Sequence, residues 1–296
     1  MHIQKSIRYF IEYCRLVFKA IKMQVWLQSK GVHVGSIVKK SFFRVRPHIG
    51  NPDKFRQTML ELSKPTRQFQ VQQTIDEPLR ITKIAGQPWW PEGVQRPKCK
   101  YGHDMSFIAQ ILLSDVPLSN LPDNALLSFH YCDTCTSEGR MSYGWFDKEN
   151  KSYDLSLFYD IDKKKPDMKG LLAPSLTKQY SISFRDVEEV LGGFCEDVNI
   201  APVDIPKDFP QGKDDFDEDI YPGLKHVSKS KVGGWASWAQ FAQWPVNEYG
   251  ERFRFLGQLD WKLFAGSPWS GGGYAYIFIT NKTDGELRAE LVIQVT

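Results

Sequence analysis

Residues 83–90 read Lys-Ile-Ala-Gly-Gln-Pro-Trp-Trp, and residues 231–238 read Lys-Val-Gly-Gly-Trp-Ala-Ser-Trp. A second pair of segments, 107–111 (Phe-Ile-Ala-Gln-Ile) and 255–259 (Phe-Leu-Gly-Gln-Leu), matches at the same offset, which is 231 minus 83, or 148 residues. A constant offset predicts a structural unit that occurs twice, from an internal duplication. The residues that recur are Lys83, Gly86, Trp90 and Gln110 in the first copy and Lys231, Gly234, Trp238 and Gln258 in the second.

The composition favours a β-rich interior, because aromatic residues make up 14% of the chain and suit pleated, half-buried surfaces. From Phe69 onward, short apolar runs are broken by Pro, Gly, Asp and Asn, as is typical of strands and turns. We expect strands over residues 125–132, 153–159, 180–184 and 274–280. A brief helix is expected over 186–191, because Gly192-Gly193 follows it.

Apolar residues recur at helical spacing over residues 3–27, and Asn51-Pro52 reads as the start of a second helix that runs to about Ser63. The expected fold is therefore α+β: two pseudo-symmetric β-rich halves with the N-terminal helices packed against them. In this interpretation residues 1–50 are a basic helical extension and residues 51–296 form one duplicated domain. Its halves cover about 70–165 and about 220–296, with a Pro-containing acidic linker between them over 204–219.

Charge is distributed unevenly along the chain. Residues 1–50 contain ten Lys or Arg and one acid, Glu12, although the whole chain has a net charge of only +3. The basic segment either contacts an anionic surface or packs its apolar stripe on the protein's own core. The low overall charge argues against a specific nucleic-acid partner. No run of eighteen apolar residues and no secretory pattern occurs, and the five Cys are an odd number, so we expect a cytoplasmic protein.

Two short clusters carry metal-ligating residue types. Cys99 and His103 form a Cys-x-x-x-His segment, and Cys132 and Cys135 form a Cys-x-x-Cys pair just past an expected strand. Thiolate and imidazole are the ligands that tetrahedral zinc prefers, so these four residues predict one structural zinc. The alternative is buried thiols without a metal, and His130 is a reserve ligand because it shares a strand face with Cys132. At the matching positions the second copy has Asn247, Glu251, Thr280 and Thr283.

Motifs of catalysis are missing from the sequence pattern. Ser270-Gly271-Gly272-Gly273 precedes an expected strand rather than a helix, so it indicates a turn and not a phosphate-binding loop. None of the six His has a convincing nucleophile beside it in sequence. Gln110 and Gln258 either tie their strands to neighbouring loops or line a cleft between the halves.

The motifs at 83–90, 105–111, 231–234 and 255–259, with the strand ending at Cys132, resemble the YwqG-like family, a domain of unknown function. A more distant similarity is to the programmed cell death 2 protein. The resemblance covers roughly residues 70–296 and implies two pseudo-symmetric β-rich halves without established catalytic residues. The chain departs from the family at Gly102, where a second Cys is usual, and at Ala85, where the family has Gly.

The sequence therefore predicts a non-enzymatic protein-binding module. The resemblance implies a toxin-immunity or chaperone-like role for it. The alternative is an enzyme or small-ligand binder that uses the cleft between the two halves. A pocket with titratable groups of shifted pKa would favour the enzyme, and an exposed apolar or acidic face would favour the binder.

Overall fold

The computed structural model describes residues 57, 59–73, 79–137, 153–167, 180–191, 225–240, 242–260, 273–281 and 287–295. The helix expected over 3–27, most of the helix expected over 51–63 and the linker expected over 204–219 lie outside these residues. Residues 49–296 form one compact unit.

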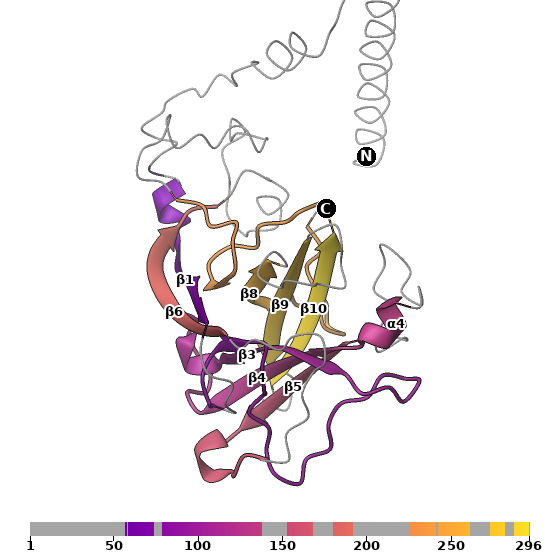
Figure 1. Ribbon diagram of the computed structural model, residues 1–296. Helices are drawn as coiled ribbons and strands as arrows, with labels where there is room; N and C mark the ends of the chain where they lie inside the picture. Colours follow the sequence, from indigo (N-terminus) through magenta and orange to yellow (C-terminus); the bar gives the residue numbers. More distant parts are fainter. Residues whose placement is uncertain are drawn as a thin grey trace, which may run out of the picture. The chain divides into compact units, whose positions relative to one another are not determined.

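Ten antiparallel strands make a single sheet (Figure 1). In chain order they are β1 (Lys64–Gln73), β2 (Lys83–Ile84), β3 (Ser106–Leu112), β4 (Ala125–Tyr131), β5 (Tyr153–Tyr159), β6 (Tyr180–Glu189), β7 (Lys231–Gly233), β8 (Arg254–Asp260), β9 (Gly273–Asn281) and β10 (Leu287–Val295). Short helical elements interrupt them: η1 (Leu113–Asp115), α4 (Asp133–Ser137) and η2 (Ile161–Lys163).

The strand order in the sheet is β10-β9-β8-β7-β1-β6-β2-β3-β4-β5. Strands β2 to β5 and strands β7 to β10 are thus two runs of four, and the long β1–β6 pair joins them. In chain order, β1 to β5 form the first half and β6 to β10 form the second. The first strand of each half pairs with a strand of the other half: β1 pairs with β7, and β6 pairs with β2. This exchange explains why the halves form one unit.

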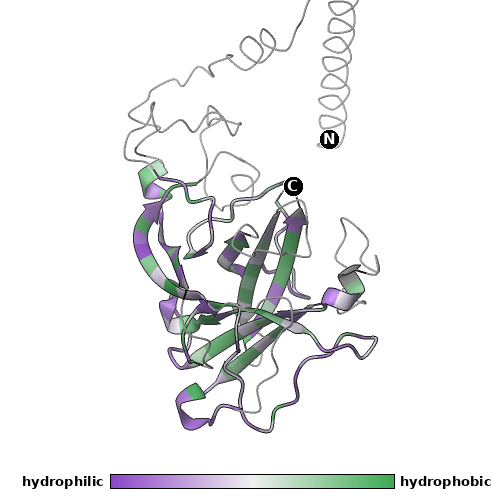
Figure 2. Cartoon of the chain, viewed as in Figure 1, coloured by the Kyte–Doolittle hydropathy of each residue, from purple (hydrophilic) through white to green (hydrophobic). Residues whose placement is uncertain are grey.

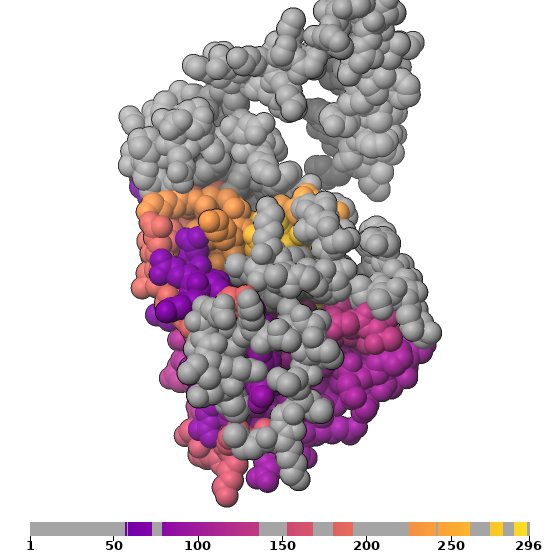
Figure 3. Space-filling view, viewed as in Figure 1, coloured from indigo at the N-terminus to yellow at the C-terminus, as the bar shows by residue number. Residues whose placement is uncertain are grey.

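The sheet is nearly closed. The backbone N–H of Leu287, at the start of β10, donates to the Tyr159 hydroxyl at the end of β5 over 3.2 Å. Apolar side chains from both halves meet in one core, which includes Leu127 of β4 and Ile277 of β9. Figure 2 shows hydrophobic residues concentrated on these strands. The space-filling view shows β1 and β6 at the surface, where Val71 and Arg185 are exposed (Figure 3).

The α+β expectation is wrong, since the described residues are mostly strand and their helical elements are short. The helix expected over 186–191 is also wrong. Residues Asp186–Glu189 continue β6, where Asp186 pairs with Arg67 and Glu189 pairs with Lys64 of β1. The Gly192-Gly193 stop signal suggested a helix, but pairing with β1 along this whole segment satisfies the backbone as a strand and decides its conformation.

Candidate metal centre

The first two ligand candidates lie on one tight turn. The Cys99 N–H donates to the His103 carbonyl over 3.0 Å, and the Gly102 N–H donates to the Cys99 carbonyl over 2.9 Å. Gly102 has φ of 83°, in the left-handed region that favours glycine. The turn conformation therefore explains why this chain has Gly102 at the position where a cysteine is usual in the YwqG-like family. The same turn places Cys99 and His103 close together.

The other two candidates lie where β4 runs into α4. Cys132 directly follows the strand, and the N–H of Cys135 points at the Cys132 sulfur over 3.5 Å. The side chain of Asp133, at the start of α4, accepts a hydrogen bond from Ser106 of β3. Strand pairing of β3 with β4 brings this segment beside the turn, since β3 begins three residues after His103.

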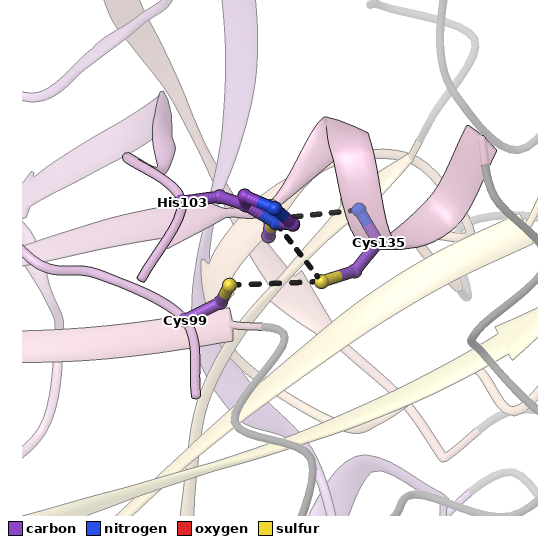
Figure 4. A group of neighbouring side chains, drawn as sticks. Cys99, His103 and Cys135 are labelled. Carbon is purple, nitrogen blue, oxygen red and sulfur yellow. Dashed lines mark hydrogen bonds between the residues drawn. The ribbon is translucent and has the colours of Figure 1, made fainter. Parts of the chain in front are cut away.

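The four donor atoms converge, as Figure 4 shows for Cys99, His103 and Cys135. All four lie within 4.8 Å of one another. The Cys135 sulfur is 3.6 Å from the Cys99 sulfur and 3.7 Å from His103 Nδ1, and the Cys132 sulfur is 3.8 Å from the same nitrogen. A tetrahedron with metal–ligand distances of about 2.0–2.3 Å has edges of about 3.5–3.8 Å. These residues are thus close enough to hold a metal ion.

The three thiols are buried, whereas His103 is only partly so. Burial, together with the neighbouring sulfurs, raises the pKa of Cys135 to about 12, and burial likewise raises the pKa of Cys132. Burial also acts to raise the pKa of Cys99, but hydrogen bonds from the N–H groups of Tyr101 and His103 and from the thiols of Cys135 and Cys132 together outweigh it, so the pKa is lowered. A cation between the sulfurs would favour their thiolate forms, which are the forms that bind metal.

His130, the reserve ligand, is not part of this group. Its ring packs against Trp90 and Phe107, with ring centroids 5.1 and 5.5 Å away. Neither ring nitrogen has a hydrogen-bond partner. Burial, aided by the charge of Arg96, lowers the pKa of His130 to about 3, so the ring is neutral.

The second half builds the same turn without a thiol or an imidazole at the matching positions. The Asn247 N–H donates to the Glu251 carbonyl over 2.9 Å, and the Gly250 N–H donates to the Asn247 carbonyl over 3.0 Å. In place of Cys99 and His103, the Asn247 amide donates to the Glu251 carboxylate over 2.8 Å. Asn247 Oδ1 also accepts from the N–H groups of Tyr249 and Glu251.

The recurring glutamines make similar contacts in both halves. Gln110 donates to the carbonyls of Leu79 and Ile81 and accepts from the Trp89 N–H over 2.9 Å. Gln258 donates to the carbonyls of two loop residues, Ser228 and Lys229, and accepts from the Ser237 N–H, also over 2.9 Å. Both side chains are fully buried, so each ties its strand to the preceding loop. Two of the three partners correspond at the offset of 148 residues, Ile81 with Lys229 and Trp89 with Ser237, whereas Ser228 is one position beyond the counterpart of Leu79. Duplication as the origin of these contacts stays a prediction.

The remaining recurring residues are also buried where the structure places them. Lys83 donates to the Gln87 carbonyl, and Lys231 to the Val227 carbonyl. Trp90 packs edge-on against Phe158, and Trp238 stacks on Phe278. Gly86 and Gly234 have φ of 71° and 73°.

Sequence reasoning missed Glu189, which is fully buried and forms an ion pair with Lys231. A Cβ atom on Gly234 would lie 2.0 Å from a Glu189 carboxylate oxygen, so this position must be glycine for the pair to form. No local pattern could reveal the pair, because its members are on strands that are far apart in sequence.

Among the described residues, no helix has the length and apolar character needed to cross a membrane. No curated protein is similar enough to the chain to count as a match. A family model does match residues 82–284, a range that contains both turns and all four candidate metal ligands. The match is consistent with the YwqG-like resemblance, while similarity to the programmed cell death 2 protein stays a prediction. Because the matched range is more than half of the chain, the protein belongs to the family described as Domain of unknown function (DUF1963).

Proposed function

We propose that Cys99, His103, Cys132 and Cys135 hold one structural zinc ion. The supporting observation is their convergence: all four donor atoms lie within 4.8 Å of one another, and three of the distances between them, 3.6, 3.7 and 3.8 Å, fit the edges of a zinc tetrahedron. Three thiolates and one imidazole suit zinc better than they suit the hard cations calcium or magnesium. Four protein ligands leave no open position for water or substrate, so the ion stabilises the turn and does no chemistry.

The turn in the second half supports a structural role. There, Asn247 and Glu251 hold the same backbone conformation by hydrogen bonds. The metal would stabilise the turn of the first half, as the hydrogen bonds of Asn247 and Glu251 stabilise the turn of the second half. It would also join the turn to the end of β4, a connection of two segments about thirty residues apart.

The zinc proposal is tested by metal removal. Thermal unfolding is followed with and without a strong chelator, and the expected result is a lower melting temperature in the chelator, restored by added zinc. The matched control is Cys132→Ser, which removes one ligand and should make the melting temperature insensitive to chelator. A wild-type melting temperature that the chelator leaves unchanged would contradict the proposal.

We propose further that the protein is a protein-binding module, of the toxin-immunity or chaperone-like kind. Support comes from the tips of the two turns, which carry Tyr101 and Tyr249 with 47% and 65% of their surface exposed. Val246, on the second turn, is 55% exposed. Tyrosine is enriched at protein interfaces, because it offers a large, rigid surface with a polar end. Rigid turns present such side chains at low entropic cost.

A photo-crosslinking residue at position 101 or 249 tests this surface. The expected product in native-host cells is one discrete conjugate from both positions. The control places the same residue at Leu60, which is also exposed and belongs to neither turn. Equal crosslinking from Leu60, or none from either turn, would contradict the assignment.

The contact of residues 1–50 with anionic surfaces stays a prediction, since those residues lie outside the described part of the chain. The cytoplasmic location also stays a prediction. The alternative function, an enzyme, requires a nucleophile or base that is free to react. The metal site provides neither once its thiols are ligands.

A further inference from the structure

Three side chains from separate segments meet beside β7. Ser237 Oγ lies 3.0 Å from His226 Nε2, and His226 Nδ1 lies 3.2 Å from a carboxylate oxygen of Glu189. Glu189 ends β6, His226 follows on the chain before β7, and Ser237 comes just after β7. The order of atoms is hydroxyl, imidazole and carboxylate, which is the arrangement that activates a serine.

The carboxylate is ionised and held on both oxygens. One oxygen accepts from the Val227 N–H over 2.9 Å and pairs with Lys231; the other accepts from the Thr66 hydroxyl over 2.9 Å. Burial acts to raise the pKa of Glu189, but the charge of Lys231 and the hydrogen bond and charge of His226 outweigh it, so the pKa lies below its usual value. A fixed anion at this place favours the His226 tautomer with its proton on Nδ1. That tautomer leaves Nε2 as an acceptor facing Ser237.

The imidazole stands between the anion and solvent. Its Nδ1 atom is buried and has no well-aligned hydrogen bond, although Glu189 is within 3.2 Å. The His226 side chain is 23% exposed and Ser237 is partly exposed, whereas Glu189 is fully buried.

A cation also lies beside the serine. Lys231 Nζ is 3.3 Å from Ser237 Oγ, and its charge would stabilise negative charge that develops there. The hydroxyl proton has two acceptors within reach, the Val227 carbonyl at 2.9 Å and His226 Nε2 at 3.0 Å. Transfer to Nε2 needs only rotation about the Cβ–Oγ bond.

The shared fold does not require this hydroxyl. The residue at the matching position in the first half is Trp89, and both residues give the same backbone hydrogen bond to a buried glutamine. Position 78, which matches His226, is proline. The serine and the histidine are therefore specific to the second half, and the hydrogen bond that both halves share at this position comes from the main chain.

We propose that Ser237 is a nucleophile that cleaves carboxylic esters, with His226 as its general base and Glu189 as the residue that positions His226. Ser237 Oγ forms a bond to the ester carbonyl carbon while its proton passes to His226 Nε2. The bond from that carbon to the alcohol oxygen breaks, and the alcohol leaves with the proton from Nε2. Water then attacks the acyl-serine, gives one proton to Nε2, and releases a carboxylic acid as the serine recovers its proton.

A fluorophosphonate probe tests the nucleophile on the full chain. Oγ displaces fluoride from phosphorus, and peptide mass spectrometry locates the adduct. We expect a single adduct on Ser237 and none on Ser237→Ala. Ser156→Ala is the matched control, because Ser156 is also partly exposed and its hydroxyl donates to the Asp154 carboxylate rather than facing an imidazole nitrogen at hydrogen-bond distance. It should label like the wild type. No adduct on the wild type, or an adduct elsewhere, overturns the proposal.

Separate variants test the base and the positioning residue. His226→Ala should slow labelling about 100-fold and recover part of the rate with added imidazole, which a structural role would not allow. Glu189→Gln should change the pH profile of labelling between about pH 5 and 9, since Glu189 and Lys231 are the charged groups that face this pair. An unslowed His226→Ala, or an unchanged profile in a folded Glu189→Gln, contradicts the assigned roles. Hydrolysis of p-nitrophenyl acetate, lost in Ser237→Ala, would extend the result to esters.

Discussion

Asn247 donates a hydrogen bond of 2.8 Å to Glu251, and this pair stands 148 residues after Cys99 and His103, on a turn with the same backbone hydrogen bonds. One turn is thus held by an amide and a carboxylate, and its counterpart presents ligands for a metal. The comparison separates what the turn needs from what the metal adds.

Replacing Cys99 and His103 by asparagine and glutamate should therefore make the stability of this turn independent of metal. In Cys99→Asn/His103→Glu we expect no bound zinc and a melting temperature that a chelator does not change. The wild type should lose roughly 5–10 °C in the chelator, which corresponds to about 2–3 kcal/mol for a domain of this size. Scanning calorimetry measures both. Asn247→Ala, which alters the other turn, should remain chelator-sensitive; a chelator-sensitive exchange variant would count against the idea.

The two buried glutamines, Gln110 and Gln258, should contribute equally to the free energy of unfolding. Gln110→Leu and Gln258→Leu each leave two carbonyls and one N–H without their amide partner, at about 1–3 kcal/mol for each buried group left unsatisfied. We expect each variant to lose roughly 3 kcal/mol in free energy of unfolding, measured in urea. Gln70→Leu, on the exposed face of β1, should change it by less than about 0.5 kcal/mol. A wild-type value for either buried variant would show that the contacts are dispensable.

The Glu189–Lys231 pair should show the cost of a lone buried charge. Glu189→Gln leaves Lys231 without its counter-charge and should cost about 3–5 kcal/mol at pH 7. The double variant Glu189→Gln/Lys231→Met should recover most of this loss. Because the folded pKa of Glu189 lies below its usual 4.5, its contribution is complete above that pH and is lost as the pH falls through the folded value. The difference in free energy of unfolding between the wild type and Glu189→Gln should therefore become smaller in acid. A difference that does not change with pH would contradict this prediction.

His130 should make the protein sensitive to acid. Its pKa is about 3 in the folded chain and 6.5 when unperturbed, so the unfolded state binds the proton first and stability falls as the pH drops below 6.5. At pH 5 this loss is about 2 kcal/mol, at roughly 1.4 kcal/mol for each unit. His130→Phe, which copies Phe278 of the second half, should remove that part of the loss. Urea unfolding at pH 7 and pH 5 measures it; equal losses in the two proteins would exclude His130 as the cause.

The local features can be predicted from the sequence. Strands over 153–159 and nearly all of 125–132 follow from short apolar runs between turn residues, and the donor atoms of Cys99, His103, Cys132 and Cys135 do meet. These features depend on neighbours in sequence, or on one pair of adjacent strands. A spacing pattern records such relationships directly.

Features that depend on strands far apart in the chain could not be predicted from the sequence pattern. Residues Asp186–Glu189 carry charges and precede two glycines, yet they are strand because β1 pairs with them. The meeting of Glu189, His226 and Ser237 requires the end of β6 to lie beside the segment that leads into β7, where Glu189 bridges to Lys225, and no local sequence pattern specifies that contact. The α+β expectation gave weight to helices near the N-terminus and missed how far one sheet would extend.

The central claim concerns the metal, and native mass spectrometry of the intact protein tests it most directly. The protein is purified without chelator from cells grown with zinc. We predict a mass that exceeds the polypeptide by about one zinc ion, and no such excess in Cys132→Ser. A metal-free wild type, or a wild type in which Cys99 and Cys135 are joined by a disulfide, would contradict the account.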